Sequence, residues 1–253
     1  MISPAAHGFG HVLEGFRLIV RPGVRRYVLI PLLINILLFG GVIYWGWNEL
    51  DRAQSWLDDR LPGWLEWLHM LVWPLFLLTA LVVVFYLFTP LANLIGAPFN
   101  AFLAERIERD LGGDLSDAPA GGLGIFVREA LRALWGELRK LVYMVLWSVP
   151  LLTLFVIPGV NLAAPVLWTL FGAWMLAIEY VDYPMGNHGM TFPQERALLR
   201  RNRPLALGFG GGILLLTMVP FVNFLAMPVG VAGATSLWVR HLRRRSADGL
   251  PDR

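Results

Sequence analysis

The sequence is 253 residues long, and 57% of its residues are hydrophobic. A mean hydropathy of +0.59 is too high for an ordinary soluble domain, so we predict an integral membrane protein. The chain has no cysteine, which excludes disulfides and thiolate metal sites. Its formal net charge is +3, and the basic residues lie beside apolar stretches, a pattern typical of membrane orientation signals rather than of nucleic-acid binding.

Residues 1–26 predict an amphipathic surface helix followed by an arginine-rich turn. Pro22 and Gly23 form the turn, and Arg25 and Arg26 directly precede a long apolar stretch. Backbone N–H groups at a helix start, the helix dipole and guanidinium groups together can hold an oxyanion. The alternative is that these arginines only bind lipid phosphates and orient the helix, and the spacing alone favours that alternative.

Two uncharged apolar stretches predict spanning helices at residues 27–47 and 70–95. The first would reach about 31 Å at about 1.5 Å per residue, enough to cross a bilayer core. The acidic, tryptophan-rich segment between them is typical of an external loop. Residues 97–140 then predict cytoplasmic amphipathic helices and a glycine-containing linker.

The last third of the chain contains an internal repeat of two apolar hairpins, residues 141–178 and 205–239, before a basic tail at 240–253. Each hairpin turns at a Pro-x-Val-Asn motif, beginning at Pro158 and Pro220. Their short first limbs and proline-containing turns favour helices that enter the bilayer without crossing it, although ordinary spanning hairpins remain an equal alternative.

The predicted orientation leaves only Arg52 and Arg60 of the 21 basic residues outside the cytoplasmic face. The fold class is therefore an all-α integral membrane protein with a single membrane domain, residues 1–253. It comprises two long transmembrane helices, two proline-turn helical hairpins that partly penetrate the membrane, and amphipathic interfacial helices.

Motifs typical of enzymes are missing from the sequence, including His-Glu-x-x-His, the P-loop and Gly-x-Ser-x-Gly. We therefore expect no catalytic residue, no metal and no cofactor. The glycine run from Gly208 to Gly212 favours close helix packing over phosphate binding. Glu179 and Asp182 form part of a polar segment at a membrane boundary, where an ionisable residue is a functional candidate and a solvated loop is the simpler alternative.

Several segments carry a resemblance to a known family when their order and spacing are taken together. They are residues 15–19, 22–35, 97–100, 103–105, 173–178, 182–184 and 187–188, with the two Pro-x-Val-Asn turns. On these segments the chain resembles the bacterial CysZ sulfate permeases, within the wider CysZ/EI24-like group, over nearly its full length.

The resemblance implies a multi-pass protein of the bacterial inner membrane that brings sulfate into the cytoplasm for cysteine biosynthesis, without its own ATPase. It implies a homo-oligomer, as a dimer or an assembly of dimers, with sulfite as a competitor or regulator. The family's sulfate-binding turn maps onto Gly23, Val24, Arg25 and Arg26, with Val24 in place of leucine. The head-to-tail assembly described for the family conflicts with the strong arginine bias of this chain.

Candidate residues along a sulfate pathway are polar side chains on the partly inserted helices. They are Asn93, Asn100, Glu105, Arg109, Glu179 and Asp182. A pair of Glu105 and Arg109 would act as a gate, and Glu179 and Asp182 would serve proton coupling; channel-like and proton-coupled movement both remain open. The alternative function is a non-transporting membrane scaffold or assembly protein whose arginine turns bind anionic lipid headgroups.

Overall fold

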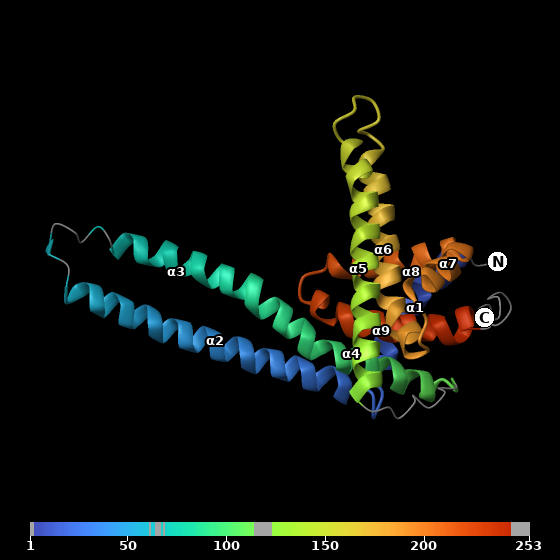
Figure 1. Ribbon diagram of the computed structural model, residues 1–253, viewed down its shortest axis with the longest axis horizontal. Helices are drawn as coiled ribbons and strands as arrows, with labels where there is room; N and C mark the ends of the chain where they lie inside the picture. Colours follow the sequence, from blue (N-terminus) through green and yellow to red (C-terminus); the bar gives the residue numbers. More distant parts are fainter. Residues whose placement is uncertain (1–2, 61, 64–66, 68, 114–122, 244–253) are drawn as a thin grey trace. The chain divides into compact units, whose positions relative to one another are not determined.

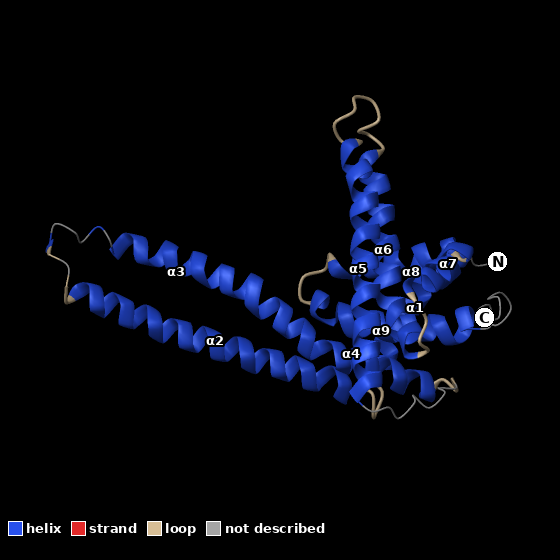
Figure 2. Cartoon of the chain, viewed as in Figure 1, coloured by secondary structure: helices blue, strands red, loops and turns tan. Residues whose placement is uncertain are grey.

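The computed structural model describes residues 3–60, 62, 63, 67, 69–113 and 123–243. Every regular element in this described part is helical, which confirms the all-α prediction (Figure 2). The chain divides into two compact units. We call Arg26–Phe99 the long-helix unit, and Met1–Arg25 together with Asn100–Arg253 the core unit.

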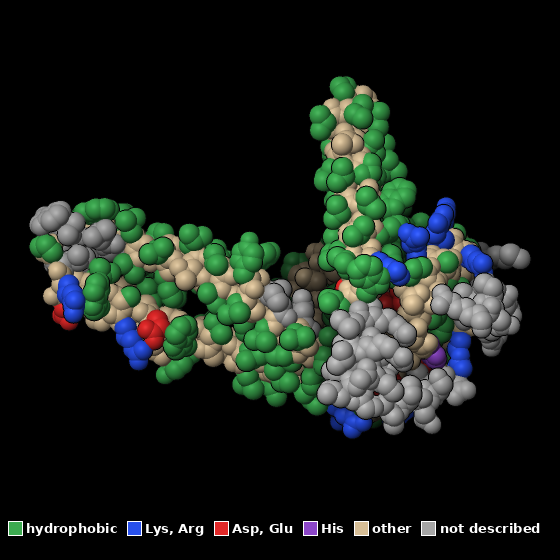
Figure 3. Space-filling view, in the orientation of Figure 1, with side chains coloured by type: hydrophobic (Ala, Val, Ile, Leu, Met, Phe, Trp, Pro, Cys, Tyr) green, Lys and Arg blue, Asp and Glu red, His purple; other side chains and the backbone are tan. Residues whose placement is uncertain are grey.

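The long-helix unit pairs α2 (Arg26–Asp58) with α3 (His69–Val83) along their length (Figure 1). A π-helical stretch, Val84–Phe88, continues α3 into α4 (Thr89–Asp110). Hydrophobic side chains cover the outside of this pair (Figure 3), and α2 and Met70–Phe88 are both long and apolar enough to cross a membrane. Such exposed apolar surface is stable only when lipid covers it, so these helices fit the two predicted long spanning helices.

Helix α2 continues well beyond the predicted end of the apolar stretch at residue 47. Its last turns are held by polar contacts, because Arg52 Nη1 donates to Glu49 Oε1 at 2.6 Å and Ser55 Oγ donates to the Asp51 carbonyl at 2.9 Å. The 33 residues of α2 span about 50 Å, whereas a bilayer core is about 30 Å thick. The charged end of α2 therefore extends into water as helix, where the sequence predicted a loop.

The core unit is built around α9 (Ala226–Leu237), in which nearly every residue is buried. The helices packed on it and on each other are α1 (Pro4–Ile19), α6 (Ala164–Asn187) and α8 (Arg203–Thr217). Helix α5 (Leu123–Thr153) lies beside α6, and α7 (Phe192–Arg201) leads into α8 (Figure 1). Both α6 and the segment Val222–Leu242 are also long and apolar enough to span a membrane.

Helix α1 is amphipathic, but protein covers its buried face. A β-carbon built on Gly8 would lie 2.0 Å from the Leu205 carbonyl oxygen of α8, and one built on Gly15 would lie 2.3 Å from the Val229 carbonyl oxygen of α9. Only glycine allows this approach. The sequence predicted that this helix rests on the membrane surface, and only its exposed face is left to do so.

The two predicted hairpin turns fall where the sequence motifs lie. Helix α5 is continuous from the predicted amphipathic segment into the first limb, and the chain then turns through Gly159, which has a φ of 82°. The second turn contains Phe221, the only described non-glycine residue with a positive φ, at 64°. Partial membrane penetration stays a prediction, because α6 alone, with 24 residues and about 36 Å, is long enough to cross.

Replacing Gly210 with alanine is expected to destabilise the core unit, whereas the same change at Gly211 is not. A β-carbon at Gly210 would lie 1.8 Å from the Ala173 carbonyl oxygen of α6, while Gly211 meets no atom within 4 Å in the described structure. The Gly210→Ala change should cost about 1–3 kcal/mol through overpacking. Gly211→Ala should be neutral or stabilising by up to about 1 kcal/mol, as expected in a helix interior. Thermal unfolding of the two variants in detergent, followed by tryptophan fluorescence, measures both, and equal midpoints would contradict this packing.

Candidate anion-binding site

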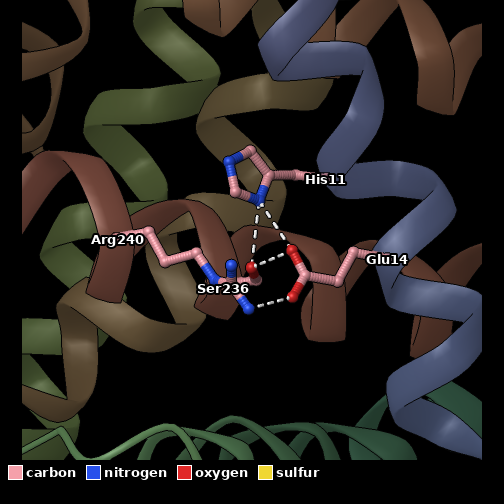
Figure 4. Close-up of polar contacts among 4 residues, drawn as sticks. All are labelled: His11, Glu14, Ser236 and Arg240. Atoms are coloured by element: carbon pink, nitrogen blue, oxygen red, sulfur yellow. Dashed lines mark hydrogen bonds and ion pairs between the residues drawn. The ribbon is translucent and has the colours of Figure 1, made fainter.

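A polar network that runs from buried His11 and Ser236 to the exposed Arg240 side chain anchors α1, the helix that leads into the arginine turn (Figure 4). Ser236 Oγ donates to Glu14 Oε2 at 2.6 Å, and Arg240 Nη2 donates to Glu14 Oε1 at 2.6 Å. His11 Nδ1 lies 2.9 Å from Ser236 Oγ, and because the serine proton is already committed to Glu14, His11 must be the donor.

His11 is neutral in this network. Burial lowers its pKa to about 4, with the nearby His241 and Arg240 acting in the same direction and Glu14 opposing them. The network therefore contains one carboxylate paired with one guanidinium, and it fixes α1 against α9 and the helical stretch that follows it.

The turn after α1 has the backbone expected of a glycine hinge. Gly23 has a φ of 85°, a region that favours glycine. The Arg21 carbonyl accepts hydrogen bonds from the N–H groups of Val24 at 3.1 Å and Arg25 at 3.2 Å. Backbone N–H groups were expected to help hold the anion, but the Val24 N–H is not available for this in the present conformation, because it is used within the turn.

Val24 and the two arginines face different surroundings. The Val24 side chain is fully buried and fixes the turn to the protein, so valine acts here by packing. Arg25 is exposed at the end of the core unit. Arg26, also exposed, begins α2, and its guanidinium donates to Tyr27 Oη at 3.0 Å and lies 4.9 Å from the Tyr27 ring centroid. Both guanidinium groups retain donors that can bind an oxyanion.

The pathway candidates on α4 are spread along the helix. Glu105 and Arg109 form the expected ion pair, with Arg109 Nη2 donating to Glu105 Oε1, and both side chains are partly or largely exposed. Asn100 is nearly buried, and its side chain is hydrogen-bonded to Tyr183 of α6. Asn93 lies in the first half of α4, and its side chain is outside the described part of the structure. A gating role for Glu105 and Arg109 stays a prediction.

Glu179 and Asp182 lie beside a buried lysine from α5. Lys140 Nζ donates to Asp182 Oδ2 at 2.6 Å and to Glu179 Oε2 at 3.4 Å, and it also lies 2.7 Å from Glu137 Oε1. Burial lowers the pKa of Lys140, but the charges of Asp182 and Glu179 outweigh burial and raise the pKa overall. Lys140 is therefore charged, and it joins α5 to α6.

Glu195 of α7 lies next to this cluster and is almost completely buried. In its ionised form neither carboxylate oxygen has a hydrogen-bond donor among the described residues, but in its protonated form it can bond to Asp182. Burial, together with the hydrogen bond and charge of Asp182, raises the pKa of Glu195 from 4.5 to about 10. Glu195 thus holds a proton at neutral pH, whereas sequence reasoning named only Glu179 and Asp182.

The stability of the protein should fall as pH rises, and Glu195→Gln should reduce that fall. Because the folded-state pKa is raised, the folded state binds more protons than the unfolded state between about pH 4.5 and pH 10, and this contribution is lost as pH rises through that window. One group supplies at most about 1.4 kcal/mol per pH unit. Thermal midpoints at pH 6 and pH 9 should differ less in Glu195→Gln than in the parent and in the exposed control Asp59→Asn. Parallel curves would contradict the assignment.

Three further polar residues in the core unit were missed from the sequence. Glu108 is fully buried and accepts hydrogen bonds from His188 Nε2 at 2.8 Å and Trp238 Nε1 at 3.3 Å. Arg106 of α4 lies against Gly23. The sequence offered one sign that Lys140 is unusual, because it is the only lysine in the chain. It offered no such sign for Glu108 or Arg106.

These features define a multi-helix membrane protein with a glycine-hinged arginine turn at the start of its first long helix. Among the described residues, no cluster of three histidine, cysteine or acidic side chains could hold a metal ion. The chain belongs to the family described as Sulfate transporter CysZ/Etoposide-induced protein 2.4, whose model matches residues 11–228.

Two relatives are both named Sulfate transporter CysZ. The chain is 44% identical over 241 residues to the protein of Pectobacterium atrosepticum, covering 95% of this chain and 87% of the relative. It is 43% identical over 243 residues to the protein of Pseudomonas aeruginosa, covering 96% of this chain and 98% of the relative. The family resemblance inferred from the sequence is confirmed.

Proposed function

We propose that this protein moves sulfate across the bacterial inner membrane and that the arginine turn collects the anion. The observation that carries the proposal is identity above 40% across nearly the whole chain to proteins named sulfate transporters. That name describes a transport protein rather than an enzyme, and it disfavours the scaffold alternative.

The geometry of the turn supports this function. Gly23 permits a tight backbone at the end of the core unit, and Val24 fixes the turn by burial. Arg25 and Arg26 are exposed and adjacent. A sulfate ion carries two negative charges, which two guanidinium groups can balance while donating several charge-assisted hydrogen bonds.

Some finer parts of the proposal rest on the family resemblance. The protein supplies sulfate for cysteine biosynthesis, works as a homo-oligomer, and responds to sulfite as a competitor or regulator. Other parts rest on the polar side chains of the partly inserted helices: Glu105 and Arg109 gate the pathway, and Asn93 and Asn100 line it. Lipid surrounds the apolar faces of the spanning helices.

Uptake of radiolabelled sulfate into proteoliposomes tests the proposed function. Vesicles with the purified parent protein should accumulate sulfate faster than protein-free vesicles of the same lipid, and excess unlabelled sulfate should compete. A flux equal to that of empty vesicles would contradict transport and would favour the scaffold alternative.

A further inference from the structure

The guanidinium group of Arg106 lies against the α-carbon of Gly23, within the core unit. A β-carbon built on Gly23 would be 3.4 Å from Arg106 Nη2, 3.8 Å from Cζ and 3.9 Å from Nε. The edge of the guanidinium that carries Nε and Nη2 therefore faces the hinge of the turn. This edge presents two parallel N–H donors, the arrangement that matches two oxygens of an oxyanion.

Arg106 has a donor without an acceptor. Its Nε is buried, and no hydrogen-bond partner for it occurs among the described residues. Buried donors are almost always paired, and an oxyanion that took the place of the Asp110 carboxylate beside the turn would pair this one. The Nη2 atom is 3.2 Å from Asp110 Oδ1, so part of the same edge is held by a carboxylate.

The backbone of the turn cannot fully surround an anion. The N–H groups of Val24 and Arg25 already donate to the Arg21 carbonyl. An anion at Gly23 must therefore obtain most of its donors from side chains. Arg25 supplies one guanidinium group from the turn, and Arg106 is the guanidinium group that packs directly on Gly23.

We propose that Arg106 is a further sulfate-binding residue and that Asp110 holds it until sulfate replaces this carboxylate. The inference rests on the proposed function, because it names a ligand at the same site. The ion pair runs from arginine to an aspartate four residues later at the C-terminal end of α4. This orientation is the weaker one for a helix, so a doubly charged anion can displace the carboxylate.

The conformation of the turn explains why the hinge is glycine. The positive φ of Gly23 disfavours a side chain, whereas a β-carbon there would only be in ordinary van der Waals contact with Arg106. The backbone therefore requires glycine, and Arg106 lies at contact distance beside it.

Calorimetric titration of sulfate into the full-length purified protein at low ionic strength tests this role. Arg106→Gln should weaken binding by about tenfold or more, the loss expected for a charge-assisted hydrogen-bonding group. Arg106→Lys should be intermediate, because it keeps the charge but lacks the Nε donor. Asp110→Asn should strengthen binding by a few-fold, because it removes the competing carboxylate. Arg200→Gln, an exposed arginine on α7, is the matched control and should bind as the parent does.

Weaker sulfate binding in Arg106→Gln together with stronger binding in Asp110→Asn would show that Arg106 binds sulfate and does not merely support the turn. If Arg106 only supported the turn, Asp110→Asn would leave sulfate affinity unchanged or lower it. Sulfate binding by the parent with unchanged affinity in Arg106→Gln would overturn the inference and leave the proposed function intact. No binding by the parent would overturn both. Thermal midpoints identify any variant that fails to fold, and Asp110→Asn then decides the question alone.

Discussion

Sulfate uptake should fall to the level of empty vesicles when Arg25 and Arg26 are both replaced by alanine. Both guanidinium groups are exposed at the turn, and each supplies charge-assisted hydrogen bonds that alanine cannot replace. Losing two such groups should lower sulfate affinity by more than about 100-fold. Initial rates of radiolabelled sulfate uptake into proteoliposomes measure the effect.

The matched control replaces a second adjacent pair, Arg200 and Arg201, at the end of α7. This control removes the same net charge and should transport sulfate at the parent rate. Parent-like uptake by the Arg25→Ala/Arg26→Ala protein would place the anion site elsewhere. Equal losses in both double variants would indicate that net charge, rather than the turn, controls uptake.

Replacing Lys140 with methionine should destabilise the core unit by about 1–3 kcal/mol. The change leaves the carboxylates of Asp182 and Glu179, which are 31% and 49% exposed, without the buried cation that pairs with them, and water replaces only part of that interaction. The thermal midpoint should fall by roughly 2–10 °C. Tryptophan fluorescence during heating in detergent provides the measurement.

Two further variants identify the cause of that loss. Arg139→Met changes the neighbouring exposed residue, which lies over the Trp135 ring, and should shift the midpoint little. Adding Asp182→Asn to Lys140→Met should recover part of the lost stability, because one of the unpaired charges is removed. A double variant less stable than Lys140→Met would show that charge pairing does not explain the role of Lys140.

The sequence predicted those features that depend on composition and local backbone chemistry. Hydropathy was sufficient to predict the helical class and the spanning stretches, because only helices and closed barrels satisfy the backbone in lipid. The small size and backbone freedom of glycine were sufficient to predict the turn at Gly23 and the close packing at Gly208, Gly210 and Gly212, each of which contacts another helix. Such features require no knowledge of distant partners.

Features that depend on tertiary partners could not be read from the sequence. Glu179 and Asp182, the partners of Lys140 on α6, lie about 40 residues away from it. The Nε of Arg106, which has no partner among the described residues, faces a turn more than 80 residues earlier. The same limit explains why α1 was predicted to lie on the membrane surface, because its apolar face suits a membrane as well as it suits α8 and α9. Helix α2 extended further than predicted since its charged end is stabilised by local side-chain bonds, which hydropathy does not register.

Selenate in place of sulfate offers the most direct test of where the anion binds, because selenium can be located by its anomalous scattering in crystals of the native protein. We expect an anomalous peak at the Gly23 turn, within hydrogen-bonding distance of the Arg25 and Arg106 guanidinium groups. The peak should disappear in crystals of the Arg25→Ala/Arg26→Ala protein. A selenate peak at another site, with none at this turn, would contradict the central claim that the glycine-hinged arginine turn collects sulfate.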